Sequence, residues 1–345
     1  MPDRPRLSSM LRGFRATRFH AALRDRLPSV IAFLSGVVVF VGIALWRYEP
    51  RKIVTSMPDL TRVERAVDGS ADWLDSGDFP ASQPVDFETA LVESIHDRGY
   101  ISVTAHVALY QESRSKKRRF ADGKSAVDNM YWGALFGIDT HLGNAAGWRR
   151  AFQDQGGGSG AIRRSVFHKR VEPNEAWQAR TVEQPFDVYV LAVAWQHSAV
   201  KEAMGQPLRE ALCGERTVLE IDGQSVEFGA GSALTGYIGQ NAMLVEYWDA
   251  FAPLAFCPRP VRQLGVFYVA PRSALLLHRQ TMEHGLYPVL FARESITPEA
   301  YLLDGMLNGL ISGELGDGFV TRAAEEYVKY QKSYTKTQVM VMLMR

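Results

Sequence analysis

Residues 264–270 read Leu-Gly-Val-Phe-Tyr-Val-Ala (LGVFYVA), an uncharged apolar run that stops at Pro271. Apolar runs of similar length cover residues 101–109, 188–194, 234–239 and 287–291. Strands that read as nearly unbroken apolar runs are those covered on both faces, as in a parallel sheet flanked by helices. These five runs therefore predict the strands of a buried, mostly parallel sheet.

The segments between these runs have the apolar spacing of helices. Helical patterns cover residues 128–142, 198–212, 242–250 and 273–284, and Gly285 supplies the left-handed residue that ends the last one. Alternation of strands and helices is the signature of an α/β layer fold. We therefore expect an α/β domain over residues 98–345, with its mostly parallel sheet flanked by helices.

Short motifs predict further features of this domain. Thr297-Pro298-Glu299 predicts the start of a helix, because proline is favoured in the first helical turn. Asp222-Gly223 predicts the tight turn of a hairpin between residues 218–221 and 225–228. The basic stretch 114–119 and the glycine-rich stretch 155–160 are expected to be surface loops.

A longer apolar run, residues 27–46 (LPSVIAFLSGVVVFVGIALW), predicts a membrane anchor. It corresponds to roughly 30 Å of helix, which is the thickness of a bilayer core. Seven arginines lie in the arm 1–26, and positive flanks favour the cytoplasmic side. We expect a single-pass membrane protein with a cytoplasmic N-terminus and an extracytoplasmic C-terminal domain, periplasmic if the source is bacterial. A cleaved signal peptide and an organellar transit peptide are the alternatives.

Residues 47–97 read as a connector between this anchor and the domain. Four prolines punctuate the stretch, and its acidic part at 72–78 offers little material for a core. Short helices are expected near residues 60–67 and 87–96. Because strand–helix alternation begins only after the connector, we expect the domain to fold without it.

The composition limits the class of partner. A net charge of +1, with 46% hydrophobic and 11% aromatic residues, describes an ordinary folded domain with no bias toward nucleic acid. The expected contacts are membrane lipid, through residues 27–46, and a protein or peptide partner. Cys213 and Cys257 allow one disulfide in an oxidising compartment or two buried thiols.

Signatures of common catalytic sites are missing from the sequence. It contains no GxxxxGK[ST], no HExxH, no CxxC and no GxSxG motif. His278 and His284 are six residues apart, which is off the spacing that places two metal ligands on one helix face. We expect neither a metal nor a cofactor.

Polar residues follow two of the expected strands at the edge where α/β proteins usually bind ligands. Residues 234–239 lead into Gln240-Asn241, and residues 264–270 lead into Pro271-Arg272-Ser273. This arrangement resembles the caspase-like cysteine peptidases (caspases, gingipains and separases), in which one strand ends in His-Gly and the next in Ala-Cys. The stretch 128–137 (DNMYWGALFG), with Asn129 and Trp132, is similar to the first helix of that fold and the loop before it.

The aligned positions lack the peptidase dyad. Gln240 stands in place of the histidine and Pro271 in place of the cysteine, so neither supplies a base or a nucleophile. The resemblance implies a non-catalytic three-layer α/β sandwich that binds or scaffolds a partner, with Gln240 and Pro271 within roughly 10 Å of each other. The expected groove is formed by Gln240, Asn241, Pro271, Arg272, Ser273, Asn129 and Trp132. The alternative is a membrane-anchored hydrolase whose nucleophile is Ser273, Cys213 or Cys257.

Overall fold

The computed structural model describes residues 86–112, 120–158, 160–257 and 262–345. The arginine-rich arm, the expected anchor at 27–46, the connector up to residue 85 and the whole basic stretch 114–119 lie outside the described residues. Within the described part of the chain, no helix combines the length and the apolar character needed to cross a bilayer. All of these residues belong to one compact unit, Pro58–Arg345.

Eight strands form one mixed sheet in the order β10-β9-β8-β7-β1-β4-β3-β2. The five at its centre run parallel: β1 (Tyr100–Ala108), β4 (Phe186–Trp195), β7 (Leu234–Ile238), β8 (Gly265–Val269) and β9 (Tyr287–Ala292). They are the five apolar runs of the sequence, and every residue of β1, β7 and β8 is buried. The α/β class and the mostly parallel sheet flanked by helices are confirmed.

Antiparallel strands complete both sides of the sheet. β3 (Ala161–Val171) pairs with β4, β2 (Arg149–Asp154) pairs with β3, and β10 (Leu343–Met344) pairs with β9. The glycine-rich stretch 155–160 connects β2 to β3. The sequence did not predict these strands, because β2 and β3 are partly exposed and rich in charged residues.

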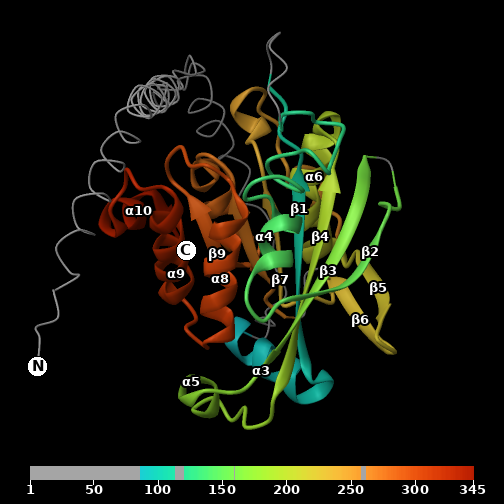
Figure 1. The fold of residues 1–345 in the computed structure, drawn as a ribbon, viewed down its shortest axis with the longest axis vertical. Helices are drawn as coiled ribbons and strands as arrows, with labels where there is room; N and C mark the ends of the chain where they lie inside the picture. Colours follow the sequence, from blue (N-terminus) through green and yellow to red (C-terminus); the bar gives the residue numbers. More distant parts are fainter. Residues whose placement is uncertain (1–85, 113–119, 159, 258–261) are drawn as a thin grey trace, which may run out of the picture. The chain divides into compact units, whose positions relative to one another are not determined.

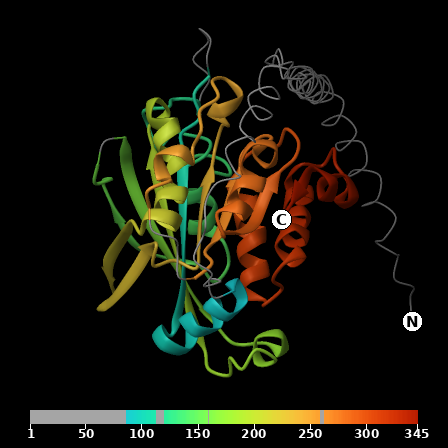
Figure 2. The same cartoon turned by 180° about the vertical axis from the view of Figure 1, so that it is seen from behind.

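Helices cover both faces of the sheet (Figures 1 and 2). One core lies beneath α3 (Phe87–Arg98), α4 (Ile138–Asn144), α5 (Glu175–Gln178), α8 (Ala300–Ile311), α9 (Asp317–Tyr330) and α10 (Lys336–Met342). The other lies beneath α6 (Val200–Cys213), the π-type turn η5 (Ala274–His278) and the 3₁₀ turns of the β7–β8 connection. α7 (Arg279–Glu283) continues from η5, and a 3₁₀ turn, η2 (His197–Ala199), leads into α6.

The hairpin β5 (Arg216–Ile221) and β6 (Gln224–Gly229) shields a third apolar cluster around Tyr189 and Leu191 of β4. Its turn has the predicted residues, with Asp222 at φ 51° and Gly223 at φ 81°. The predicted hairpin is confirmed, and its positive φ angles explain the Asp-Gly pair.

α3 belongs to the folded unit, although the sequence analysis assigned its residues to the connector. Asp86 caps its N-terminus by accepting a hydrogen bond from the Thr89 amide at 3.1 Å. Phe87 and Leu91 are buried in the same cluster as Ile101 and Val103 of β1. The folded unit therefore begins before the expected boundary at residue 98.

The expected helices have mixed outcomes. The helices over 198–212 and 273–284 are present as α6 and as η5 followed by α7, and Gly285 has the expected left-handed φ of 76°. The helix expected over 128–142 is wrong, because turns occupy the segment up to residue 137 and only α4 is helical. The helix expected over 242–250 is also wrong beyond one 3₁₀ turn, η3 (Ala242–Leu244). The helix predicted from Thr297 starts at Ala300 as α8, with Glu299 as its N-cap.

Candidate functional site

The candidate site lies at the carboxyl edge, where the parallel strands end. The second parallel strand, β4, lies on one side of β1 and the third, β7, on the other, so the direction of winding reverses between β1 and β7. In open α/β sheets such a reversal opens a crevice beside the carboxyl ends of the strands, and ligands bind there. The segments that follow Ala108, Ile238 and Val269 surround this position.

Gln240 and Pro271 follow neighbouring strands. Ile238 pairs with Val269, and the Gly239 amide donates to the Val269 carbonyl at 3.2 Å. Both residues are half-buried. The Gln240 carbonyl accepts a hydrogen bond from the Tyr237 hydroxyl at 2.8 Å, whereas its side-chain amide bonds to no described residue. The Gln240 amide is therefore available to a ligand.

Asn241 joins these two segments. Its Nδ2 donates to the Pro271 carbonyl at 2.8 Å, and its Oδ1 accepts from the Met243 amide at 3.1 Å. The second bond caps the 3₁₀ turn η3, a common role for asparagine. With both functions of its amide engaged inside the protein, Asn241 positions the site and offers little to a ligand.

Ser273 also has an internal role. Its Oγ donates to the Tyr268 carbonyl at 2.7 Å and accepts from the Ala292 amide at 3.0 Å, and the residue is fully buried. These bonds join the ends of β8 and β9. A hydroxyl held in this way is not exposed for attack on a substrate.

Arg272 is the charged residue of this part of the edge. Its φ of 56° is a left-handed conformation that is uncommon for a non-glycine residue, and its amide donates to the Glu294 carbonyl at 3.1 Å. The guanidinium makes no ion pair or hydrogen bond with a described residue, and the side chain is half-buried. It therefore adds an uncompensated positive charge next to Pro271.

Asn129 and Trp132 lie in the loop that follows β1, and both are completely buried. Asn129 Oδ1 accepts from the amides of Tyr110 and Tyr131, at 3.0 and 3.1 Å. Its Nδ2 donates to the carbonyls of Tyr110 and Asp122, at 2.8 and 2.9 Å. All four hydrogen-bonding positions of the amide are used, so Asn129 holds the loop together and replaces the helix expected there. Trp132 also faces the interior, and its Nε1 makes no hydrogen bond with any described residue.

Tyrosines and one carboxyl line the base of the β1 loop. The rings of Tyr110 and Tyr131 meet edge to face with centroids 5.4 Å apart. Burial raises the pKa of Tyr131 well above its usual range, and Tyr110, Glu299 and Tyr237 raise it further. Burial also raises the pKa of Glu299, although a hydrogen bond from Tyr301 opposes the shift. The sequence analysis missed this group because nothing in the local pattern brings the N-terminus of α8 next to the β1 loop.

The two cysteines form a disulfide. Cys213 at the end of α6 is bonded to Cys257 in the β7–β8 connection, with Cα atoms 4.8 Å apart. This selects one of the alternatives that the sequence left open. The chain has no other cysteine, so no thiol remains as a nucleophile while the bond is intact.

A second polar group is sealed between the sheet and α6. His106 Nε2 lies 2.9 Å from Glu210 Oε1, and the Trp195 indole donates to His106 Nδ1 at 3.1 Å. Because an indole nitrogen only donates, Nδ1 must accept, and the Nε2 proton points to Glu210. The Thr235 hydroxyl donates to the other oxygen of Glu210 at 2.5 Å. His106 and Glu210 are buried, so this network holds α6 to β1 and β7 without facing a substrate.

Among the described residues, no cluster of three histidine, cysteine, aspartate or glutamate side chains has the arrangement of a metal site. No family model, no curated protein and no solved structure matches this chain. Its function must therefore be argued from the chemistry of its own residues.

Proposed function

We propose that this chain is a single-pass, membrane-anchored and non-catalytic α/β module of the caspase-like type, which binds a protein or peptide at the carboxyl edge of its sheet. Residues 27–46 are its anchor in the lipid, and the folded unit faces the extracytoplasmic side. The observation that carries the proposal is the chemistry of two adjacent strand ends. Gln240 and Pro271 offer an amide and an apolar ring there, without a nucleophile or a base.

The three nucleophiles of the alternative hydrolase are all engaged. Ser273 is fully buried with its hydroxyl oxygen bonded twice, and Cys213 and Cys257 are bonded to each other. An activated nucleophile needs an accessible oxygen or sulfur next to a general base. These facts favour the binding module over the hydrolase.

Exposed apolar side chains at the same edge support a role in binding. Val127 and Leu135 in the β1 loop are more than half exposed, and Val245 after β7 is 90% exposed. Leu275 after β8 is also exposed. Apolar groups presented beside free polar groups, here the Gln240 amide and Arg272, are typical of surfaces that bind polypeptide.

The disulfide supports the extracytoplasmic placement. Disulfides persist in oxidising compartments and are rare in the cytosol. The arginine-rich arm favours the same orientation, because positive flanks resist translocation. A reporter that is active only in the cytoplasm, fused after Arg345, should give no signal, and a strong signal would reverse the proposed orientation.

The strand-end alignment can be tested by restoring the dyad. We would compare Pro271→Cys with the double variant Gln240→His/Pro271→Cys and measure how the rate of alkylation of the new thiol depends on pH. The native cysteines do not interfere, since they are bonded to each other. A nearby imidazolium stabilises a thiolate, so the double variant should show a lower apparent thiol pKa. Identical profiles for the two variants would refute the alignment.

The binding function needs a separate test. A photo-crosslinking amino acid at Gln240 or Arg272, introduced into cells that express the full chain, should form discrete protein adducts. The same residue at Arg279, an exposed position on α7, is the control. An activated-serine probe that labels the native chain at one site, and loses this labelling on denaturation, would instead favour the hydrolase.

A further inference from the structure

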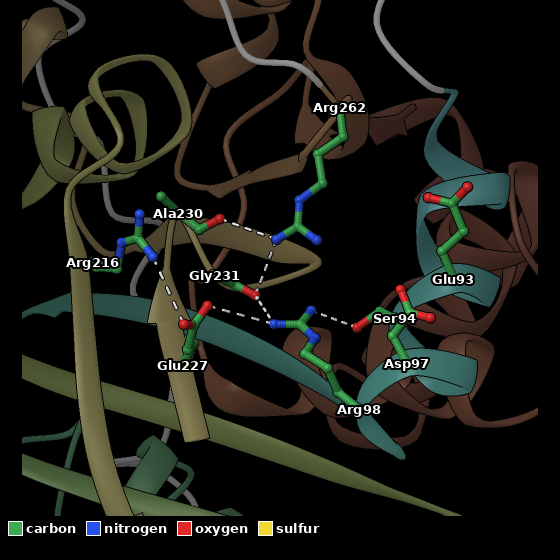
Figure 3. Close-up of a pocket in the computed structure, with 9 residues that line it drawn as sticks. All are labelled: Glu93, Ser94, Asp97, Arg98, Arg216, Glu227, Ala230, Gly231 and Arg262. Atoms are coloured by element: carbon green, nitrogen blue, oxygen red, sulfur yellow. Dashed lines mark hydrogen bonds and ion pairs between the residues drawn. The ribbon is translucent and has the colours of Figure 1, made fainter. Parts of the chain in front are cut away.

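A hollow of about 420 Å³ opens at the amino edge of the sheet, opposite the candidate site (Figure 3). It lies between the C-terminal half of α3, the end of the β5–β6 hairpin and the segment that leads into β8. Charged side chains dominate its lining, which consists of Glu93, Ser94, Asp97, Arg98, Arg216, Glu227, Ala230, Gly231 and Arg262. Its size falls within the range of small-molecule sites.

Two guanidinium groups meet on the inner wall of this hollow. Arg98 Nη1 and Arg262 Nη2 both donate to the Gly231 carbonyl, at 3.0 and 3.2 Å. Arg262 Nη2 also donates to the Ala230 carbonyl at 3.1 Å. Two like charges on one carbonyl oxygen repel each other, and burial together with Arg98 lowers the pKa of Arg262. An anion bound to both groups would relieve this repulsion.

The acids of the protein neutralise these arginines incompletely. Glu227 lies 3.7 Å from Arg98 and 3.7 Å from Arg216, which are long distances for ion pairs. Arg262 makes no ion pair with any described residue, and its Nε and Nη1 make no hydrogen bond with one. A guanidinium is well suited to bind a carboxylate through two parallel hydrogen bonds.

Two carboxylates face Arg262 from the side of α3. Glu93 and Asp97 are one helical turn apart, and Figure 3 shows both beside the hollow. Both side chains are exposed, and neither forms an ion pair with a described residue. The formal charges of the three arginines and the three acids cancel, so the hollow has no net attraction for a polyanion such as nucleic acid. The charges are nevertheless partly separated, because Glu227 lies among the arginines whereas Glu93 and Asp97 lie on the opposite side, on α3 (Figure 3).

We propose that this hollow binds a small zwitterion of the amino acid or short peptide class. Its carboxylate binds between Arg98 and Arg262, and its ammonium binds to Glu93 and Asp97. This arrangement gives partners to Arg262 Nε and Nη1 and to the carboxylates of Glu93 and Asp97, none of which pairs with a described residue. Arg98 Nη1 and Nη2 already donate to the Gly231 carbonyl and to Ser94 Oγ, so Arg98 contributes mainly its charge. The site is separate from the carboxyl edge and does not depend on the function proposed there.

Diglycine is a suitable probe, because matched compounds lack one charge each: N-acetylglycine lacks the ammonium and glycinamide lacks the carboxylate. Calorimetric titration of the full chain at constant ionic strength should give the tightest binding for diglycine. Arg262→Gln should weaken diglycine binding at least tenfold. The double variant Glu93→Gln/Asp97→Asn should bind diglycine and N-acetylglycine with equal affinity, because it lacks the carboxylates that bind the ammonium of diglycine.

Arg279→Gln is the matched control, because Arg279 is exposed on α7 and pairs only with Glu283 among the described residues. Arg262→Lys keeps the positive charge but loses the paired donors, so it separates a loss of binding from a loss of folding. Circular dichroism should show native structure in every variant. We expect intermediate binding for Arg262→Lys. Undetectable binding of diglycine to the wild-type chain, or unchanged binding in a folded Arg262→Gln variant, would overturn the proposal. Equal affinity for diglycine and N-acetylglycine would overturn the role of Glu93 and Asp97.

Discussion

The Cys213–Cys257 disulfide should contribute a large part of the stability of the folded unit. It closes a loop of 44 residues between the end of α6 and the β7–β8 connection. In the chain-entropy model, such a loop lowers the entropy of the unfolded chain by an amount worth about 4 kcal/mol at 25 °C. Domains are commonly stable by only about 5–15 kcal/mol, so the loss of this bond would be a severe perturbation. We expect the double variant Cys213→Ala/Cys257→Ala to have a free energy of unfolding lower by up to about 4 kcal/mol.

Urea unfolding followed by tryptophan fluorescence would measure this difference. Dithiothreitol should lower the unfolding midpoint of the wild-type chain and leave that of the double variant unchanged, which controls for other effects of the reductant. A thiol reagent should find no reactive cysteine in the untreated native protein. Two titratable thiols in that protein, or equal midpoints for wild type and double variant, would refute the reasoning. The former result would also remove one argument for an extracytoplasmic location.

Three further predictions concern single residues. Leu91→Ala should destabilise the folded unit by about 2–5 kcal/mol in urea unfolding, because Leu91 is fully buried, and a variant as stable as wild type would mean that α3 is dispensable. Ser273→Ala should cost about 1–3 kcal/mol by leaving the Ala292 amide without its acceptor, and the loss of a measurable hydrolytic activity with unchanged stability would contradict this structural role. Burial raises the pKa of Glu299 above the ordinary value of 4.5, so the folded state holds this proton more tightly than the unfolded state. Stability should therefore fall as pH rises from about 4.5 through the raised pKa, and Glu299→Gln should flatten this part of the profile; an unchanged profile would argue against a buried Glu299.

The sequence predicted the parallel core well because burial on both faces requires continuous apolar residues. β1, β4, β7, β8 and β9 all fall on the apolar runs, and the Asp222-Gly223 turn was recognisable from its backbone requirements. The order of these strands was not readable, since pairing between β1 and β7 joins residues that are far apart in the chain.

The helices expected over residues 128–142 and 242–250 are largely absent, because side chains and close backbone contacts stabilise turns in their place. In the β1 loop, the side chain of Asn129 bonds to the backbone of Tyr110 and Asp122, which lie outside the expected helix, and to the Tyr131 amide. These bonds hold the segment in a compact turn. Gly133 and Gly137 pack so closely on neighbouring backbone that a Cβ at either position would lie within 2.5 Å of it. After β7, Asn241 caps the start of one 3₁₀ turn through the Met243 amide and also bonds to the Pro271 carbonyl, a contact that depends on the position of β8. Helical periodicity alone does not register such competing bonds.

In the candidate site too, the sequence indicated the position of the residues, whereas tertiary contacts determined their roles. The sequence predicted that Gln240, Asn241, Pro271, Arg272 and Ser273 lie near one another, because they follow two expected strands and parallel strands end at one edge of the sheet. Which of them keep free polar groups depended on tertiary contacts: Ser273 and Asn241 are engaged inside the protein, whereas the Gln240 amide and the Arg272 guanidinium bond to no described residue. Asn129 and Trp132 are likewise buried.

The sequence by itself determined the α/β class, the apolar strands, the hairpin turn and the presence of Gln240 and Pro271, rather than a histidine and a cysteine, after two of these strands. These are properties of residue type and spacing, which act within a few residues. Only the tertiary structure decided the Cys213–Cys257 bond, the burial of Ser273 and the meeting of Arg98 with Arg262 at one carbonyl. Each depends on segments distant in the chain, whose approach is determined by the packing of the whole core rather than by any local pattern.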